Sequence, residues 1–350
     1  MHVDIRWIKQ RPHFLAEQLS IDNDLLVLYA YSFIRKNLVN SSNKFNSFPF
    51  LIFPFFFKSK FIRRINSFIL KIIFKLVIIF FKPKFIWISS PFQFNFFFKN
   101  DKKKIIYDCM DNFVDFFNDS IIKNEINILE KKIDKSARKI FCSSTLLFKK
   151  FDKDKTFVIN NAYSEDWSIR LRNYKLNNKI LKKNITICYF GTISNWIDFD
   201  LLLFVSRKYK FVKIKLIGPF ENIPKEVNLS KSFQFIRSTN HENLLNQIMD
   251  VDIFIMPFIL NNLILHVDPV KVYEYILLNK PIILPYYDEL KKFSKFVKFY
   301  KNKSEFINLV DSLSKSSFQL DYSKKDMIKF LRSNSWENRA HQINNILKKN

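Results

Sequence analysis

A segment near the C-terminus, "HVDPVKVYEYILLNKPIILP" at 266–285, holds residue types that suit an anionic ligand. Asp268 is a good helix N-cap and Pro269 suits the first helical position, so a helix is expected to begin here. Lys271 and Glu274 share one face of this helix, because they are three residues apart. A helix N-terminus with a lysine binds phosphate, and a carboxylate one turn later can accept hydrogen bonds from sugar hydroxyls. The pattern suits a nucleoside diphosphate with its ribose, but on spacing alone an ordinary solvated Lys/Glu pair is the better explanation.

The only two glycines of the chain, Gly191 and Gly218, end the apolar runs "ITICYFG" and "VKIKLIG". Roughly 7% glycine is usual, so each of the two is expected to hold a position that a side chain cannot enter. Ligands of parallel sheets lie beyond the carboxyl ends of the strands. The strand ends of the second half are therefore functional candidates, namely Gly191, Thr192, Gly218, Pro219, Pro257 and Phe258.

The first half also places polar side chains at strand and helix ends. Gln10, Arg11 and His13 begin the first predicted helix, and Asp108 and Asp111 follow the run "KKIIYD". Arg11 and Asp111 could form a structural ion pair or could contact an acceptor, and the residues do not decide between the two. Asp111 and His13 are the candidates for a catalytic base, but His13 is better explained as a helix-cap or surface histidine.

The order of apolar runs predicts two doubly wound α/β domains. "KFIWISS", "KKIIYDCM", "RKIFCSS" and "KTFVIN" alternate with polar helical stretches, and a crossover helix is expected over "DSIIKNEINILEKKIDKSA". The second series comprises "ITICYFG", "VKIKLIG", "FQFI", "VDIFIMP" and "PIILPY", with helices from about Asp198 and Thr239. We expect domains at 1–167 and 185–325, a linker at 168–184, and a C-terminal helix at 326–350 that packs back toward the first domain.

The composition favours a folded, basic protein that meets an anionic partner. The chain has 350 residues, 48% of them hydrophobic, and a formal net charge of +26. Such a charge favours nucleic acid or anionic lipid; no nucleic-acid-binding module is present, so the membrane surface is preferred. Three cysteines without paired spacing are expected to be reduced core residues of a cytoplasmic protein. Because the first residues are polar, no secretory signal peptide is expected in them.

Residues 58–84 combine Lys and Arg with the apolar run "FILKIIFKLVIIFF". This run, Phe68–Phe81, carries Lys71 and Lys75 and is too short for a membrane-spanning helix, which needs about 20 residues. The segment is expected to be a buried crossover helix whose lysines reach solvent. Docking of an amphipathic helix on anionic lipid is expected as an added role.

The segment "DPVKVYEYILLNKPIILP" resembles the nucleotide-sugar segment of GT-B glycosyltransferases of the glycosyltransferase group 1 type. "YFGTISNWIDFDLL", "KLIGPF" and "VDIFIMPF" match in the same order. "WIKQRPHFLAEQL", "YDCMDNF", "IFCSSTLL" and "SWENRAHQI" extend the resemblance over nearly the whole chain. It is similar to bacterial enzymes of capsule, teichuronic-acid and related cell-surface polysaccharide synthesis. The resemblance implies two Rossmann-like domains facing across a cleft, Glu274 on the ribose hydroxyls of a nucleotide-sugar donor, and the loop after Gly191 near the diphosphate.

The resemblance also assigns sides to the candidate residues. It implies donor binding by Gly191, Thr192, Gly218, Pro219, Pro257, Phe258, His266, Asp268, Pro269, Val270, Lys271 and Glu274. It implies acceptor contacts by Gln10, Arg11, Asp108 and Asp111.

Three positions depart from the family pattern. His266 stands where many relatives have a sugar-binding Glu, and Thr192 and Asp198 stand where many have Arg and Lys. Lys271 is therefore expected to carry more of the diphosphate charge. Before the "QRP" segment only "MHVDI" could form the first strand, so this strand is expected to be short or truncated, or the start to be placed too late.

The sequence thus predicts a sugar transferase acting on a saccharide or lipid-linked saccharide acceptor, peripheral on the inner face of the cell membrane. No cofactor is expected beyond the donor, and no carboxylate motif suited to a metal on the diphosphate is evident. The alternatives are a GT-B sugar epimerase and a non-catalytic basic nucleic-acid-binding protein.

Overall fold

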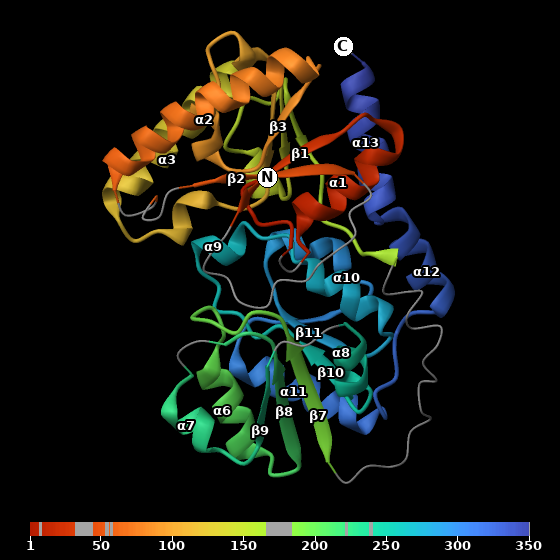
Figure 1. The fold of residues 1–350 in the computed structure, drawn as a ribbon. Coiled ribbons are helices and arrows are strands. Elements are labelled where there is room, and N and C mark those ends of the chain that lie inside the picture. Colours follow the sequence, from red (N-terminus) through yellow and green to blue (C-terminus); the bar gives the residue numbers. More distant parts are fainter. Residues whose placement is uncertain are drawn as a thin grey trace. The chain divides into compact units, whose positions relative to one another are not determined.

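The computed structural model describes residues 1–6, 9–31, 45–52, 56, 59–165, 184–220, 223–237 and 241–349 (Figure 1). The chain divides into two compact units, each with a hydrophobic core of its own. Unit 1 comprises Met1–Asn161, His266–Asp268 and Trp336–Asn350, and unit 2 comprises Ala162–Leu265 and Pro269–Ser335. The predicted linker lies outside the described residues except for residue 184.

Unit 2 is built on a six-stranded parallel sheet with the order β12-β11-β10-β7-β8-β9. This is the doubly wound order 3-2-1-4-5-6 of dinucleotide-binding folds, counted from β7 as the first strand. Its strands are β7 (Ile185–Phe190), β8 (Val212–Ile217), β9 (Phe233–Ile236), β10 (Ile253–Ile255), β11 (Ile282–Pro285) and β12 (Lys298–Tyr300). Its helices are α6 (Phe199–Lys208), α7 (Lys225–Leu229), α8 (His241–Ile248), α9 (Asn262–Leu265), α10 (Val270–Leu277), η4 (Asp288–Phe293), α11 (Lys303–Lys315) and α12 (Lys324–Ser333).

The local sequence explains these elements. All six residues of β7 are buried, as expected for a parallel strand covered on both faces. Helix α6 begins after Asp198, whose carboxylate accepts a hydrogen bond from the backbone N–H of Leu201 at 2.8 Å. The five predicted strands of this half are confirmed. The helix start predicted at Thr239 lies outside the described residues, and β12 and α11 were not predicted.

Unit 1 contains two separate parallel sheets, with the orders β1-β2 and β3-β4-β5-β6. The strands are β1 (Leu26–Tyr31), β2 (Asn46–Leu51), β3 (Ile86–Ile88), β4 (Ile105–Cys109), β5 (Lys139–Cys142) and β6 (Thr156–Val158). The helices are α1 (Arg11–Asp22), α2 (Lys60–Phe81), η1 (Pro91–Phe96), η2 (Asp101–Lys104), η3 (Phe113–Phe116), α3 (Ser120–Ser136), α4 (Thr145–Phe148) and α13 (Trp336–Lys348).

Helix α3 is the predicted crossover helix. It buries Ile122, Ile126, Leu129 and Ile133 on one face, whereas Ile121 at its start is 64% exposed. Asp119 caps the helix by accepting the N–H of Ile121 at 2.7 Å. The helix therefore packs through its apolar spacing, as the sequence indicates.

The predicted C-terminal helix is two helices. Helix α12 belongs to unit 2 and ends at Ser333, and α13 begins at Trp336 in unit 1. Between them Ser335 forms a parallel β-bridge with Tyr163, which interrupts the helical path. Helix α13 packs on α1, where the Trp336 ring stacks on Phe14 with 5.2 Å between the ring centroids.

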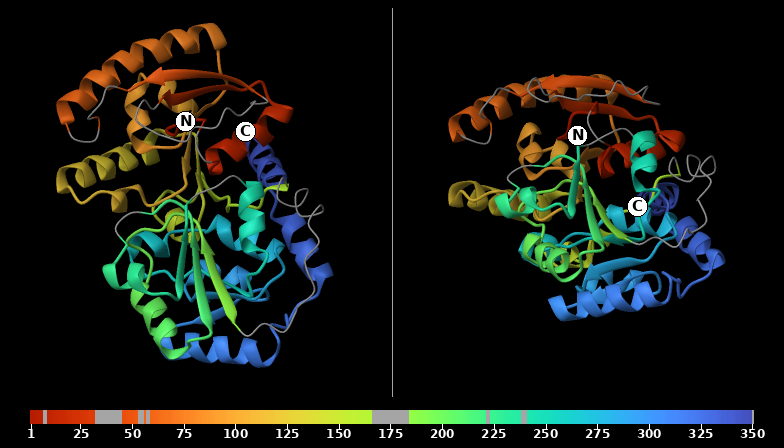
Figure 2. Two further views of the ribbon diagram at one scale, coloured as in Figure 1. Left: turned by 60° about the horizontal axis from the view of Figure 1, so that its bottom comes forward. Right: turned by 90° about the horizontal axis from the view of Figure 1, so that it is seen from below.

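Helix α2 lies along the outer side of unit 1 in both views of Figure 2. Only Arg63, Asn66, Leu70 and Phe74 are buried along its 22 residues. The expectation of a buried crossover helix is therefore wrong for most of its surface. Among the described residues no helix is long and apolar enough to cross a bilayer.

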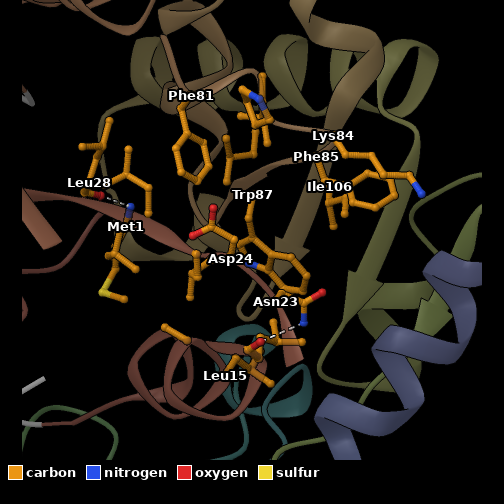
Figure 3. Close-up of a pocket in the computed structure, with 18 of the residues that line it drawn as sticks. Met1, Leu15, Asn23, Asp24, Leu28, Phe81, Lys84, Phe85, Trp87 and Ile106 are labelled. Atoms are coloured by element: carbon orange, nitrogen blue, oxygen red, sulfur yellow. Dashed lines mark hydrogen bonds between the residues drawn. The ribbon is translucent and has the colours of Figure 1, made fainter. Parts of the chain in front are cut away.

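The two sheets of unit 1 are separated by an apolar cavity of about 610 Å³ (Figure 3). Strands β1 and β3 both line it, together with the inner face of α2. Met1 sits at one end of the cavity: its ammonium donates to the carbonyl of Leu28 at 2.6 Å, and its carbonyl accepts from Ala30 at 3.2 Å. This is the hydrogen-bond pattern of a parallel bridge. Burial lowers the pKa of the Met1 ammonium to about 5.

Candidate functional site

The two glycines lie against each other at the carboxyl edge of the unit 2 sheet. Gly191 follows β7 with a φ of 149°, and Gly218 follows β8 with a φ of 148°. A Cβ atom on Gly218 would overlap the carbonyl oxygen of Gly191, and one on Gly191 would lie 2.6 Å from the hydroxyl of Tyr189. The prediction that no side chain fits at either position is confirmed.

Backbone hydrogen bonds connect the loop after Gly191 to two neighbouring loops. Ile193 donates to the carbonyl of Pro219 at 2.9 Å, which connects it to the loop after β8. Asp198 donates to the carbonyl of Pro257 at 2.7 Å, which connects it to the loop after β10. Three predicted strand ends thus form one continuous rim. Thr192 and Pro219 are exposed on it, Phe258 is half-buried and Pro257 is buried.

This rim lies at the topological switch point of the sheet. Strands β7 and β10 are neighbours, the chain leaves β7 toward β8 and leaves β10 toward β11, and all pairs are parallel. Connections that leave in opposite directions open a crevice at the carboxyl ends of the two central strands, where ligands of such sheets bind. The candidate site therefore lies beside the ends of β7 and β10.

The start of α10 differs from the prediction. Pro269, not Asp268, is the N-cap residue, and it offers no side-chain hydrogen bond. The Asp268 carboxylate instead accepts the backbone N–H of Asn161 at 2.6 Å within unit 1. The prediction that Asp268 caps the helix is wrong because its side chain is engaged elsewhere. Val270, the first residue of α10, is half-buried.

Lys271 and Glu274 form an ion pair on α10, with 2.9 Å between Nζ and the carboxylate. The Glu274 side chain is only 8% exposed and that of Lys271 is 35% exposed. The interpretation as an ordinary solvated pair is therefore wrong for Glu274. The Lys271 ammonium lies 5.2 Å from the ring centroid of Phe190, the last residue of β7. The pair thus lies beside the rim described above.

Two tyrosines that sequence reasoning missed hold this arrangement. The Tyr275 hydroxyl accepts the backbone N–H of Phe190 at 3.2 Å, and the two rings contact edge-on with centroids 4.8 Å apart. The Tyr189 hydroxyl donates to the carbonyl of Thr192 at 3.0 Å. Tyr275 follows Glu274 directly, so the pair "EY" was the available signal. Helix α10 is thereby fixed to the end of β7.

In unit 1 Arg11 pairs with Asp108, and not with Asp111 as in one of the two alternatives that the sequence left open. Arg11 donates to the fully buried carboxylate of Asp108 at 2.9 Å and to the carbonyl of Ile159 at 2.7 Å. It does not pair with Asp111. Asp108 lies inside β4 and points to the buried start of α1, whereas Asp111 follows the strand. Arg11 and Asp108 therefore form a structural ion pair.

The same network fixes the segment before α10. Asn161 donates from its backbone and side chain to the carboxylate and carbonyl of Asp268, each at 2.6 Å. Arg339 on α13 donates to the carbonyl of Asn160 at 3.0 Å. The carbonyl of His266 accepts the Ser144 hydroxyl at 2.6 Å. Asn161 and Ser144 have no recognisable spacing to 266–268 in the sequence, so this arrangement could not be predicted.

Comparison with known proteins shows which fold this is. No family model and no curated protein match the sequence. The structure is similar to sucrose-phosphate synthase from Thermosynechococcus elongatus, with a TM-score of 0.69 at 12% identity over 96% of this chain and 91% of that one. It is also similar to Anabaena HepE in complex with UDP and glucose, with a TM-score of 0.67 at 11% identity over 99% and 98%. The chain has the GT-B fold.

Further matches agree with the GT-B fold. A trehalose-6-phosphate synthase has a TM-score of 0.68 at 11% identity and covers 99% of this chain and 98% of its own. A UDP-N-acetylglucosamine 2-epimerase from Rickettsia bellii has a lower TM-score, 0.56, at 10% identity over 97% and 94%. The prediction of a two-domain Rossmann-like GT-B architecture is confirmed.

Asp111 has the electrostatics of a proton acceptor. It is half-buried in the loop after β4, and burial raises the pKa of its carboxyl to about 7 against the opposing effect of Arg11. The loop is held on both sides of it: Ser143 donates to the carbonyl of Met110 at 2.7 Å, and Lys150 donates to Asn112 at 2.8 Å. A carboxyl near neutral pKa on a fixed loop can exchange a proton at physiological pH.

His13 acts as a helix cap in this fold. Its Nδ1 accepts the backbone N–H of Gln10 at 3.1 Å, and its Nε2 lies 3.4 Å from the carbonyl of Asp4. The ring is buried, and burial lowers its pKa, so the neutral form is favoured. With both ring nitrogens engaged, His13 is poorly placed to act as a base, which leaves Asp111 as the stronger candidate.

Among the described residues no cluster of three or more His, Cys, Asp or Glu side chains could hold a metal ion. Cys109 and Cys142 are register partners on β4 and β5, and all three cysteines are buried and free. The neighbouring pair was not expected from their sequence spacing.

Proposed function

We propose that this GT-B protein is a glycosyltransferase that uses a nucleotide-diphosphate sugar as donor. The observation that carries the proposal is the buried Glu274, paired with Lys271 on a helix fixed beside the switch point of the unit 2 sheet. Neighbours with the same fold support it, because HepE was solved in complexes with UDP and with UDP-glucose.

In this proposal the donor lies on the rim of unit 2. The Glu274 carboxylate accepts hydrogen bonds from the ribose hydroxyls, and charge-assisted bonds of this kind are about twice as strong as neutral ones. The diphosphate lies against the loop after Gly191 and the first turn of α10, where the helix dipole, backbone N–H groups and Lys271 offset its charge. The same groups stabilise the departing nucleoside diphosphate as its bond to the sugar breaks.

The reaction needs a group that receives the acceptor proton. We assign this role to Asp111: as the acceptor oxygen bonds to the anomeric carbon, its proton passes to the carboxylate and the nucleoside diphosphate leaves. The raised pKa and the fixed loop support the assignment. Gln10 at the start of α1 is a proposed acceptor contact, whereas Arg11 and Asp108 are proposed to act by holding the acceptor-side loops.

The acceptor, the biological role and the location belong to the proposal as well. We propose a saccharide or lipid-linked saccharide acceptor in cell-surface polysaccharide synthesis, at the inner face of the cell membrane. The net charge of +26 supports an anionic surface as partner. Neither a cofactor nor a metal is proposed, and turnover in the presence of EDTA tests this point.

The experiment is a release assay for nucleoside diphosphate from a panel of nucleotide sugars, with and without lipid-linked saccharide acceptors. Release that depends on acceptor supports the proposal. An epimerase is the second candidate, favoured by the Rickettsia bellii neighbour. It would convert the donor without acceptor, which chromatography of the recovered nucleotide sugar detects. Salt-sensitive binding to arbitrary DNA without any donor binding would instead identify a nucleic-acid-binding protein.

A further inference from the structure

Helix α2 exposes a continuous apolar stripe on unit 1. Nine large apolar side chains on it are between 37% and 84% exposed: Phe61, Ile65, Phe68, Ile69, Ile72, Ile73, Leu76, Ile79 and Phe80. With 3.6 residues per turn they fall within an arc of about 140°, so they form one face. We name this face the apolar stripe. Exposed apolar surfaces of this extent mark interaction sites in soluble proteins.

The stripe is not required for the core of unit 1. The opposite face of α2 carries its buried residues, and Leu70 and Phe74 pack there in the core under β2 and η1. The helix also has its own termini: the Ser59 hydroxyl accepts the N–H of Ile62, and Lys82 ends the helix in the left-handed conformation. The outward face of α2, which carries the apolar stripe, is therefore exposed and can contact a partner.

The charges of α2 indicate what that partner is. The helix contains five basic residues and no acidic one. Lys60, Arg64, Lys71 and Lys75 lie within an arc of about 60° along one edge of the stripe. Among the described residues no carboxylate pairs with Lys60, Arg64 or Lys71, whereas Lys75 lies 3.3 Å from Asp101. Cations beside an apolar face match a membrane surface with anionic headgroups.

A groove of about 350 Å³ runs along this basic edge. Lys60, Arg64 and Lys71 line it, together with the side chains of Ser67 and Asn95. Glu125 also lines it, but Arg63 pairs with that carboxylate at 2.6 Å. The groove thus offers cations and hydrogen-bond donors next to apolar side chains, as a lipid phosphate with its acyl chains requires.

We infer that α2 binds the surface of an anionic lipid bilayer, lying parallel to it with the apolar stripe among the acyl chains and lipid phosphates in the basic groove. The proposed function enters this inference at one point: membrane binding would hold the enzyme near a lipid-linked acceptor. A helix of 22 residues is about 33 Å long, so it can span many headgroups. Because charge and apolar contact both contribute, removal of either weakens binding.

The test is flotation of the full chain with vesicles of phosphatidylcholine alone or with 30% phosphatidylglycerol. The stripe variant is Ile72→Asn with Leu76→Asn, and the charge variant is Arg64→Gln with Lys71→Gln. The matched controls are Ile121→Asn on α3 and Leu229→Asn on α7, which are 64% and 72% exposed. Thermal unfolding and nucleotide-sugar binding without vesicles, measured for every variant, separate a failure of docking from a failure of the proposed function.

We expect binding to anionic vesicles at least tenfold tighter than to neutral ones. The charge variant should lose more than tenfold, since each basic residue near such a surface contributes roughly a fivefold factor. The stripe variant should lose at least tenfold, and both controls should bind like the parent. Equal binding of the stripe variant and the parent would overturn the inference. The inference would also be overturned if the parent were a dimer, the stripe variant were a monomer, and both bound vesicles equally. The stripe would then join two copies of this chain.

Discussion

Replacing Glu274 by Gln tests the proposed ribose contact with minimal change of shape. The variant keeps the size of the side chain and its capacity to accept a hydrogen bond, but removes the charge. A hydrogen bond to a charged group contributes about 1.5 to 3 kcal/mol, roughly twice the neutral value. At 1.4 kcal/mol per factor of ten, donor affinity should fall at least tenfold if two such ribose bonds lose their charge.

The structure also sets the expected cost in stability. The variant breaks the ion pair of Glu274 with Lys271, but the lysine side chain is 35% exposed and can be hydrated. Solvent screening limits the loss to about 1 kcal/mol or less. For a domain of this size that corresponds to a fall in Tm of about 2 to 4 °C. Donor binding should therefore fall much more than stability.

Unit 2 offers a matched control in Glu289, which pairs with Lys292 at 2.8 Å with the same spacing and a side-chain exposure of 4%. Calorimetric titration of a bound nucleotide sugar, with thermal unfolding of each variant, gives both quantities. Glu289→Gln should cost similar stability and leave donor affinity unchanged. If Glu274→Gln lowers Tm like the control and binds the donor like the parent, the carboxylate is only structural and the assignment of the ribose contact is refuted.

Four further predictions follow from the same geometry. Lys271→Ala should weaken binding of a nucleoside diphosphate more than that of the nucleoside, measured by titration with both. Asp111→Asn should abolish the rise of transfer rate with pH up to about 7, and because burial favours the protonated carboxyl of the parent, the variant should gain more thermal stability at pH 8 than at pH 5. Gly218→Ala should yield little folded protein, because its Cβ would overlap the Gly191 carbonyl, as circular dichroism will show. Five strand-forming residues added before Met1 should continue its parallel bridge into the cavity and raise Tm, whereas five prolines should not.

Much of unit 2 could be predicted because its sequence signals are local. Continuous apolar runs mark the buried parallel strands, and the two rare glycines mark the positive-φ positions directly after β7 and β8. The spacing of Lys271 and Glu274 identified their ion pair. The sequence did not reveal the burial of Glu274, because burial depends on how α10 packs, and the contact of Tyr275 with Phe190 that fixes α10 to β7 forms only with the sheet.

The errors in unit 1 have a shared physical cause. From the sequence, either Asp108 or Asp111 could pair with Arg11. Asp108 is the partner, because its position in β4 points its buried carboxylate toward Arg11. Asp268 looked like a helix cap, but a contact with Asn161, more than a hundred residues earlier, uses its carboxylate. Helix α2 was expected to be buried from its hydrophobicity alone, whereas only one of its faces packs. Contacts between residues far apart in the sequence determine which partner a side chain binds and which face of a helix is buried. The periodicity of the sequence does not show these contacts.

The most direct test of the central claim is thermal unfolding of the parent protein with a panel of nucleotide sugars and nucleoside diphosphates. A ligand at a hundred times its Kd stabilises the fold by about 2.7 kcal/mol. We predict that at least one nucleotide sugar and its nucleoside diphosphate raise Tm by about 5 to 10 °C, and that Glu274→Gln removes most of this shift at the same concentration. No shift with any nucleotide sugar in a folded protein would contradict a donor site at the switch point of unit 2.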